Sequence, residues 1–276
     1  MDTPGPDLFT RVGVRAPDGA RAEITPYGAH VTSWVTPDGR ERLFLSRATS
    51  FSPGSAIRGG VPVVFPQFAR RGPLRPHGFA RISPWQHVAT QRVPHGASAQ
   101  FRLEDSGATR ADWDYGFRLD LRVTVGGARL ELALRATNTG DRPFTFTAAL
   151  HTYLRVADIA RTGVEGLAGI AYAEHGEDRV QREALLHING EIDRIYWDVP
   201  GPVTLVDTGQ TLRVSQAGFT DVVVWNPGPE RAAALPDLEL GGYRHMLCIE
   251  AAAIGQPITL GPRGEWQGWQ RIDALA

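Results

Sequence analysis

Hydrophobic and polar residues alternate along most of this chain, in short runs separated by glycine, proline and asparagine. Runs of period two are typical of antiparallel strands with one buried face. Helical periodicity is scarce, and only 232–243 leaves room for a short helix or a long loop. The pattern predicts an all-β protein built as a sandwich or barrel. The expected strands lie at 30–35, 42–46, 117–125, 128–137, 144–156, 203–208, 211–216, 221–226 and 245–253.

Turn residues indicate where these strands reverse. Thr36-Pro37-Asp38-Gly39 separates the first two runs, because proline presets φ and glycine accepts a left-handed conformation. Gly126-Gly127 suits a two-residue hairpin turn, and Asn138-Thr139-Gly140-Asp141 suits the next reversal. No composition break, low-complexity linker or repeat divides the chain. We therefore expect residues 1–276 to form a single domain.

Composition limits the classes of function. The 276 residues are 42% apolar with a formal net charge of -1, so the broad positive field of a nucleic-acid or membrane-binding protein is missing. All 29 basic residues counted as Lys+Arg are arginines, which excludes a Schiff-base lysine, a pyridoxal phosphate lysine and a P-loop. The lone Cys248 cannot form an internal disulfide or build a zinc site by itself.

Location and partners follow from what the chain lacks. The N-terminal MDTPGPDLFTRV carries early acidic residues and no apolar signal region, and no apolar run approaches the ~18 residues of a membrane span. We expect a cytoplasmic monomer that acts on a small molecule, without nucleic acid, membrane, metal or cofactor.

Arginines gather in one segment, 57–81 (IRGGVPVVFPQFARRGPLRPHGFAR), which holds five of them and one histidine among glycines and prolines. Guanidinium groups offer planar pairs of donors that match phosphate or carboxylate oxygens, and they stay charged at every accessible pH. In a nearly neutral chain this segment predicts a local anion site.

Two ionisable residues stand out in predicted strands. In 144–156, alternation places His151 on the more polar face with threonines, although a lone strand histidine is more often held by a neighbouring hydroxyl or carbonyl. Glu250 is surrounded by apolar residues in 246–254, and burying an unpaired carboxylate is costly. The Glu250 carboxylate therefore needs an arginine partner or a functional role. Burial raises the pKa of a carboxylate towards the range useful to a general base, unless arginines lower it. The two residues are a plausible acid and base pair.

A family resemblance runs over nearly the whole chain. The segments RGGVPVVFPQF, PHGFAR, ALHTYLRV, EIDRIYWD, VVVWNPGP and MLCIEAAAI occur here in the order of the hexose-6-phosphate mutarotases, also called glucose-6-phosphate 1-epimerases, of the aldose 1-epimerase superfamily. The chain resembles this family in all six segments. The resemblance implies a large antiparallel β-sandwich of the galactose mutarotase type, and interconversion of the α and β anomers of a hexose 6-phosphate without a cofactor.

The resemblance also implies roles for single residues. His151 would be the catalytic acid and Glu250 the catalytic base, while Arg58 and Arg81 would hold the 6-phosphate. Asp193 matches the sugar-binding aspartate of the family, and its ordinary alternative is a turn aspartate paired with Arg194. His77 corresponds to the family's HG histidine, which would contact sugar hydroxyls or orient the base. Trp225 and Asn226 would line the pocket or only pack in the core, and Arg70, Arg71 and Arg75 are expected to be solvated loop charges.

One departure from the family pattern leaves the preferred hexose open. Members often carry a polar residue just before the HG histidine, whereas this chain reads Leu74-Arg75-Pro76-His77-Gly78. Two other functions also stay open: an epimerase for unphosphorylated aldoses, and a carbohydrate-binding β-sandwich without turnover. A metal-dependent cupin is disfavoured, because no H-x-H pair exists and the eight histidines are scattered.

Overall fold

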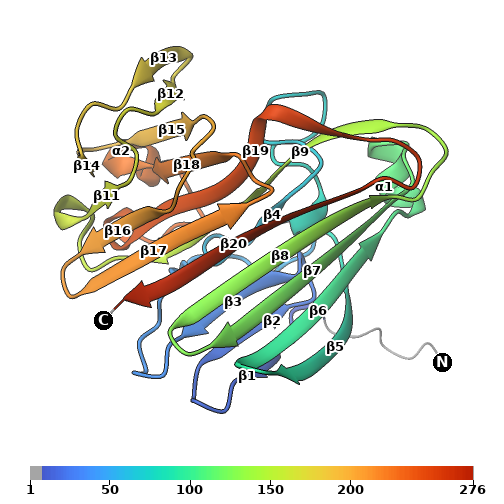
Figure 1. The fold of residues 1–276 in the computed structure, drawn as a ribbon, viewed down its shortest axis with the longest axis horizontal. Helices are drawn as coiled ribbons and strands as arrows, with labels where there is room; N and C mark the ends of the chain where they lie inside the picture. Colours follow the sequence, from blue (N-terminus) through green and yellow to red (C-terminus); the bar gives the residue numbers. More distant parts are fainter. Residues whose placement is uncertain (1–7, 276) are drawn as a thin grey trace.

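Three antiparallel sheets account for most of the computed structural model, which describes residues 8–275 (Figure 1). The largest has nine strands in the order β14 (Leu185–His187), β11 (Gly163–Glu165), β16 (Val203–Asp207), β17 (Gln210–Ala217), β20 (Glu265–Leu275), β8 (Arg129–Asn138), β7 (Phe117–Gly126), β6 (Gly96–Glu104) and β5 (Gln86–Val93). The prediction that the N-terminal segment lacks an apolar signal region falls partly on residues 1–7, which lie outside the described residues.

The other layer is made by the two remaining sheets. The eight-stranded sheet runs β13 (Glu177–Val180), β12 (Ala171–Glu174), β15 (Ile192–Tyr196), β18 (Asp221–Asn226), β19 (Met246–Leu260), β9 (Phe144–Leu150) and β4 (Val63–Val64), with β10 (Tyr153–Arg155) also paired to β19. The three-stranded sheet is β1 (Val12–Arg15), β2 (Arg21–Thr25) and β3 (His30–Val35). Its β1 and β2 contact β6 and β7 of the nine-stranded sheet.

Alternation along each strand decides which side chains enter the core. In β9, Phe146 and Leu150 point into the main core between the layers, as Leu121 in β7 and Leu132 in β8 do from the opposite sheet. The other face of the eight-stranded sheet carries a second apolar cluster, which includes Ala149 of β9. A strand buried on both faces is unusual for an antiparallel sheet that faces water on one side. Loops must therefore cover that outer face.

Helices are short. Besides α1 (Gly107–Asp112) and α2 (Gly228–Ala233), three 3₁₀ turns span Ala80–Ile82, Ile159–Arg161 and Gly242–His245. The predicted short helix or loop at 232–243 is therefore mostly loop, flanked by α2 and the last 3₁₀ turn. No helix within the described range is long and apolar enough to cross a membrane.

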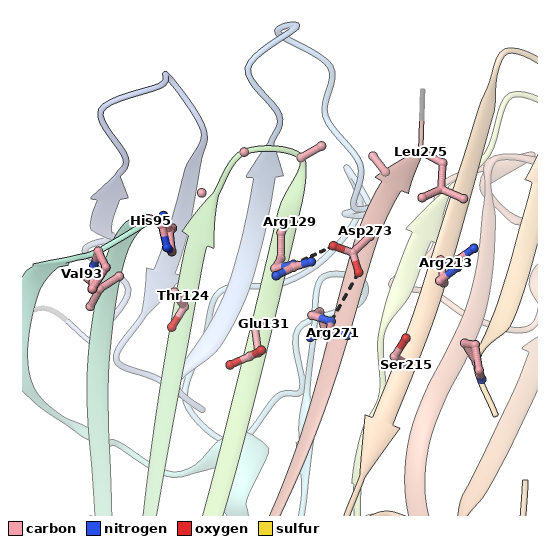
Figure 2. Close-up of a pocket in the computed structure, with 16 residues that line it drawn as sticks. Val93, His95, Thr124, Arg129, Glu131, Arg213, Ser215, Arg271, Asp273 and Leu275 are labelled. Atoms are coloured by element: carbon pink, nitrogen blue, oxygen red, sulfur yellow. Dashed lines mark hydrogen bonds and ion pairs between the residues drawn. The ribbon is translucent and has the colours of Figure 1, made fainter. Parts of the chain in front are cut away.

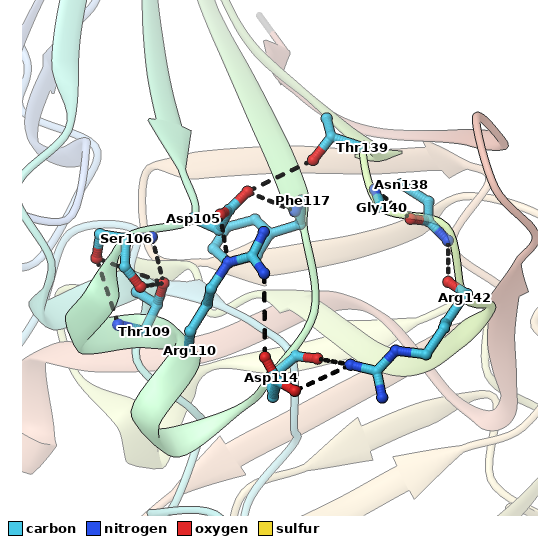
Figure 3. Close-up of polar contacts among 10 residues, drawn as sticks. All are labelled: Asp105, Ser106, Thr109, Arg110, Asp114, Phe117, Asn138, Thr139, Gly140 and Arg142. Carbon is cyan, nitrogen blue, oxygen red and sulfur yellow. Dashed lines mark hydrogen bonds and ion pairs between the residues drawn. The ribbon is translucent and has the colours of Figure 1, made fainter.

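Polar contacts hold α1 against one end of the sandwich (Figure 3). Ser106 caps the helix: its hydroxyl accepts from the backbone N–H of Thr109, whose own hydroxyl accepts from the N–H of Ser106. Arg110 pairs with Asp105 at 2.7 Å, and Arg142, in the turn before β9, donates to Asp114 at 3.0 Å. These contacts tie the helix to the turn that precedes β9.

The predicted strands are found with three corrections. The β7–β8 hairpin turns at Gly127 and Ala128, one position later than predicted, because Gly126 still pairs with Arg129. Residues 42–46 form no strand: Glu41, Leu43 and Leu45 make single bridges to three different segments, so no continuous ladder develops.

The third correction concerns 144–156, predicted as one strand. It is interrupted after Leu150, where the N–H of His151 donates to the Pro62 carbonyl and the N–H of Thr152 donates to that of Leu150. His151 therefore lies in the break between β9 and β10, not inside a strand.

Candidate active site

Strand register brings the candidate acid and base together on the outer face of the eight-stranded sheet. Leu150 pairs with Ala251 before the break and Tyr153 pairs with Cys248 after it. Both pairings share one register, so His151 stands opposite Glu250. On the other side of β19, Glu250 pairs with Val223 of β18. The sequence alone did not predict this pairing, because a hundred residues separate the two strands.

A neighbouring row on the same face brings in a further sugar-binding candidate. Asp193 of β15 pairs with Trp225 of β18, which pairs with Cys248, which pairs with Tyr153. Each of these positions lies two residues from the row of Glu250 on its strand, so both rows face the same side. The sheet thus places Asp193 and Tyr153 on a row next to that of His151 and Glu250.

His151 and Glu250 are buried and close. His151 is 7% exposed and Glu250 2%, and Nδ1 of His151 lies 3.3 Å from Oε1 of Glu250. The angles at this contact are not those of a hydrogen bond: within residues 8–275, both Nδ1 of His151 and Oε2 of Glu250 are without a hydrogen-bond partner. Buried polar atoms without partners are rare and point to a role beyond stability.

Burial pushes the pKa values of the pair in opposite directions. Desolvation raises the pKa of Glu250 well above its usual value; Asp193 adds to the rise and the positive charge of Arg81 opposes it. Desolvation also lowers the pKa of His151 well below its usual value, helped by the nearby His77, Arg81 and Arg58. Burial therefore disfavours the charged form of both groups. The expectation that burial raises the Glu250 pKa agrees with these directions.

Aromatic rings enclose the imidazole of His151. The Tyr153 ring stacks on it at 4.8 Å with an interplanar angle of 9°, and the Trp225 ring meets it edge-on at 5.9 Å. The ring of His77, in the loop before the first 3₁₀ turn, has its centroid 5.5 Å from that of the His151 ring. Trp225 thus belongs to the surroundings of the candidate acid. Asn226 instead donates to the carbonyls of Tyr243 and Met246, which is a structural role.

Arg58 reaches the site from the loop before β4. Its Nη1 donates to the Tyr153 hydroxyl at 3.0 Å, and its Nη2 lies 3.1 Å from Oδ2 of Asp237. Gly59 has a φ of +109°, and a Cβ there would lie 2.4 Å from the Phe44 carbonyl oxygen, so only glycine lets the chain pass. Tyr153 and Asp237 were not predicted as site residues; only the tertiary contacts reveal them.

Arg81 and His77 come from the loop that ends in the first 3₁₀ turn. Nη2 of Arg81 donates to the Pro76 carbonyl at 3.0 Å. Its charge lowers the pKa values of Glu250 and His151, so it lies within electrostatic reach of both. The His77 ring packs edge-on against Phe68. The arginine-rich segment 57–81 thus brings its first and last arginines, Arg58 and Arg81, within electrostatic reach of His151 and Glu250.

Asp193 is a strand residue, not a turn aspartate. It contacts Arg231 of α2 at 3.4 Å, while Arg194 pairs with Glu174 instead. Its side chain is 39% exposed, yet its charge raises the pKa of Glu250. The alternative pairing with Arg194 is therefore wrong. Arg70, Arg71 and Arg75 are exposed, as predicted for solvated loop charges.

The hollow in Figure 2 is a different place, on the outer face of the nine-stranded sheet. Arg129 and Arg271 there share the carboxylate of Asp273, so much of their charge is neutralised. None of the six predicted site residues lines it. The hollow is therefore separate from the site that His151 and Glu250 form on the eight-stranded sheet.

A β-sandwich that buries a carboxylate against a histidine, with arginines beside them, defines a protein of the sugar mutarotase class. The profile of the family described as "Aldose 1-epimerase" matches residues 11–273. The chain belongs to this family. A protein of Cenchrus ciliaris, named "Putative glucose-6-phosphate 1-epimerase", is 36% identical, covering 98% of this chain and 86% of its own.

Two bacterial comparisons agree. A protein of Salmonella typhimurium with the same name is 34% identical over 86% of this chain and 81% of its own length. The crystal structure of "a putative mutarotase" from that organism superposes with a TM-score of 0.86 at 31% identity, over 92% of this chain and 87% of that one. The predicted all-β fold, an antiparallel β-sandwich of the galactose mutarotase type, is confirmed.

Acid should destabilise the protein. The pKa of His30 falls to about 4 and that of His77 to about 3, mainly through burial, and that of His151 falls too. Below pH ~6.5, the usual pKa of histidine, these three histidines bind protons in the unfolded chain but not in the folded chain. Glu250, whose pKa is raised by burial, binds one proton more in the folded chain. The net of about two protons predicts a loss of ~2.7 kcal/mol per pH unit between about pH 6 and 4.5.

Denaturant unfolding at several pH values between 7.5 and 4.5 measures this loss. His30→Gln keeps a donor for the Gly59 carbonyl, which Nε2 of His30 contacts at 2.8 Å, and should reduce the slope by about one proton. A free energy of unfolding that stays constant between pH 6 and 4.5 would contradict the buried neutral histidines.

Proposed function

We propose that this protein interconverts the α and β anomers of a hexose 6-phosphate, with glucose 6-phosphate as substrate, and is thus an isomerase. One observation carries the proposal: a buried carboxylate faces a buried histidine at 3.3 Å, with two arginines in electrostatic reach. The names of the relatives agree with it. Two arginines beside the pair favour a phosphorylated sugar over a free aldose, because guanidinium groups bind phosphate oxygens through charge-assisted pairs of hydrogen bonds.

The reaction needs two proton transfers and no redox chemistry. Glu250 takes the proton from the anomeric hydroxyl while His151 protonates the ring oxygen, so the bond between C1 and the ring oxygen breaks and the free aldehyde forms. Rotation about the bond from C1 to C2, followed by ring closure on the opposite face, gives the other anomer. The two protons return in the reverse order. Each positioned acid or base contributes about 10²- to 10⁴-fold.

The phosphate has a second task beyond anchoring. Ring opening in the direction above needs an ionised Glu250 and a protonated His151, whereas burial raises the pKa of Glu250 and lowers that of His151. The charges of Arg58 and Arg81 lower the pKa of His151. A bound phosphate, largely dianionic above its second pKa of ~6, neutralises them. The pKa of His151 then rises, which favours its protonated form as the acid, and the pKa of Glu250, which the charge of Arg81 also lowers, rises with it.

Substrate binding is assigned to residues around the pair. Arg58 and Arg81 hold the phosphate oxygens through charge-assisted hydrogen bonds. Asp193, on the neighbouring row, accepts hydrogen bonds from sugar hydroxyls, and His77 contacts the sugar from the arginine-rich loop. No cofactor takes part in this scheme.

Exchange NMR on equilibrated sugars tests the proposal. The wild-type protein should accelerate exchange between the anomers of glucose 6-phosphate, and saturating free glucose should react with a lower kcat as well as a higher KM. Binding without faster exchange would identify a carbohydrate-binding module. Equal kcat/KM for glucose and its 6-phosphate would identify an epimerase for free aldoses and would refute the phosphate role of Arg58 and Arg81.

Tyr153 should position the site through two separable contacts. Tyr153→Phe keeps the ring stacked on His151 but removes the hydroxyl bonded to Arg58, so KM for glucose 6-phosphate should rise about tenfold while kcat stays nearly constant. Tyr153→Leu also removes the ring stacked on His151, so kcat should fall about two- to tenfold in addition to the rise in KM. Steady-state kinetics of both variants distinguishes the contacts. Identical effects on kcat would show that the hydroxyl and the ring act together.

A further inference from the structure

Cys248 stands beside the acid and base and has no part in the chemistry proposed above. It precedes Glu250 by two residues on β19, so both side chains lie on the outer face of the sheet, and Tyr153 next to His151 is its strand partner. Its thiol is fully buried. One nitrogen of His151, the sulfur of Cys248 and one carboxylate oxygen of Glu250 all lie within 4.8 Å of one another.

These three side chains could hold a metal ion. Imidazole, thiolate and carboxylate are the three ligand types that bind zinc, with bond lengths of about 2.0–2.3 Å, and thiolate selects soft cations. Tetrahedral bonds of that length hold nitrogen and oxygen ligands about 3.3 Å apart. Nδ1 of His151 and Oε1 of Glu250 are separated by 3.3 Å without a hydrogen bond between them. The Cys248 sulfur lies within 4.8 Å of the other two donor atoms and must move closer by up to about 1 Å, because tetrahedral bonds hold sulfur about 3.6 Å from nitrogen and oxygen ligands.

We infer that His151, Cys248 and Glu250 bind a soft divalent cation, Zn²⁺ or Cd²⁺, and that this cation inhibits the enzyme by occupying its acid and base. Inhibition by the cation rests on the proposed function, whereas binding of the cation does not. Three protein ligands leave a fourth position for water.

The cation replaces the protons of the Cys248 thiol and the Glu250 carboxyl group, so binding leaves the net charge of the site unchanged. A thiolate and a carboxylate supply two negative charges, and Asp193 adds a third nearby, whereas Arg81 and Arg58 oppose a cation. Because thiol and carboxyl groups must be deprotonated to bind a metal, binding releases both protons to solvent. Affinity therefore increases with pH. Phosphate bound at the arginines would remove their repulsion, but the sugar would occupy the space that the metal needs.

Cd²⁺ alone is the probe, because its bond to thiolate gives an ultraviolet charge-transfer band and Cys248 is the single cysteine of the chain. Titration of the wild-type protein should give the band at one Cd²⁺ per chain. Cys248→Ser should lose it. His151→Asn keeps the thiol and should bind Cd²⁺ at least tenfold more weakly, since even outer partners of metal ligands are worth about 10- to 100-fold.

Activity gives an independent reading. Zn²⁺ should inhibit wild-type anomer exchange, a chelator should reverse the inhibition, and Cys248→Ser should keep its basal rate while its inhibition constant rises at least tenfold. The absence of a band in the wild type, or equal Zn²⁺ sensitivity in Cys248→Ser, would overturn the inferred site. A normal band in a protein that does not accelerate exchange would leave the metal site standing and refute the proposed function instead.

Discussion

Glu250→Gln should slow the exchange of glucose 6-phosphate anomers by about 10²- to 10⁴-fold, with little change in KM. Glutamine has nearly the same shape, but it cannot accept the proton of the anomeric hydroxyl. The substitution also removes a buried ionisable group, since the carboxyl group is 2% exposed and has an oxygen without a partner. Thermal unfolding should therefore show equal or greater stability at neutral pH, which separates lost chemistry from lost folding.

A matched control is available on the other sheet. Glu131→Gln makes the same change at a half-buried position of β8, next to the hollow of Figure 2. Its exchange rate should equal that of the wild type. If Glu250→Gln keeps a rate within a few-fold of wild type, Glu250 is not the base. His151→Asn should then be measured to find whether the histidine alone carries the reaction.

Replacing both anchoring arginines should produce the second large effect. Arg58→Met with Arg81→Met removes the two guanidinium groups, and each hydrogen bond to a charged group is worth ~1.5–3 kcal/mol. We expect kcat/KM for glucose 6-phosphate to fall at least about 10²-fold, and kcat/KM for free glucose to change little. Because a phosphate-induced pKa change in His151 is also lost, kcat should fall together with the rise in KM.

Two controls accompany the arginine variant. Arg70→Met removes an exposed arginine of the same segment and should leave both substrates unaffected. Asp237→Asn, added to Arg58→Met, removes the carboxylate that Arg58 contacts at 3.1 Å, so that no unpaired charge remains. Competition by inorganic phosphate, measured as a function of salt, provides a direct reading of the anion site. An equal loss of activity on glucose would mean that these arginines support the pair rather than the phosphate.

Local pattern predicted most of the strands, and the exceptions have physical causes. Alternation in 117–137 reports burial on one face, which is a property of neighbouring residues and can be read from the chain. Residues 42–46 have the same alternation, but their backbone groups meet three different segments, and only long-range pairing decides that. The break at His151 likewise depends on a carbonyl supplied by Pro62.

The sequence by itself determined the chemistry that this protein can use: one carboxylate in an apolar run, a histidine among threonines, and arginines among glycines, with no lysine. Residue types and their local surroundings suffice for that. Only the tertiary structure decided which groups meet. The register of β19 against β9 and β10 places Glu250 opposite His151, brings Cys248 beside them and stacks Tyr153 on the imidazole. Such contacts join segments about a hundred residues apart, and their geometry is set by sheet pairing, which local sequence does not encode.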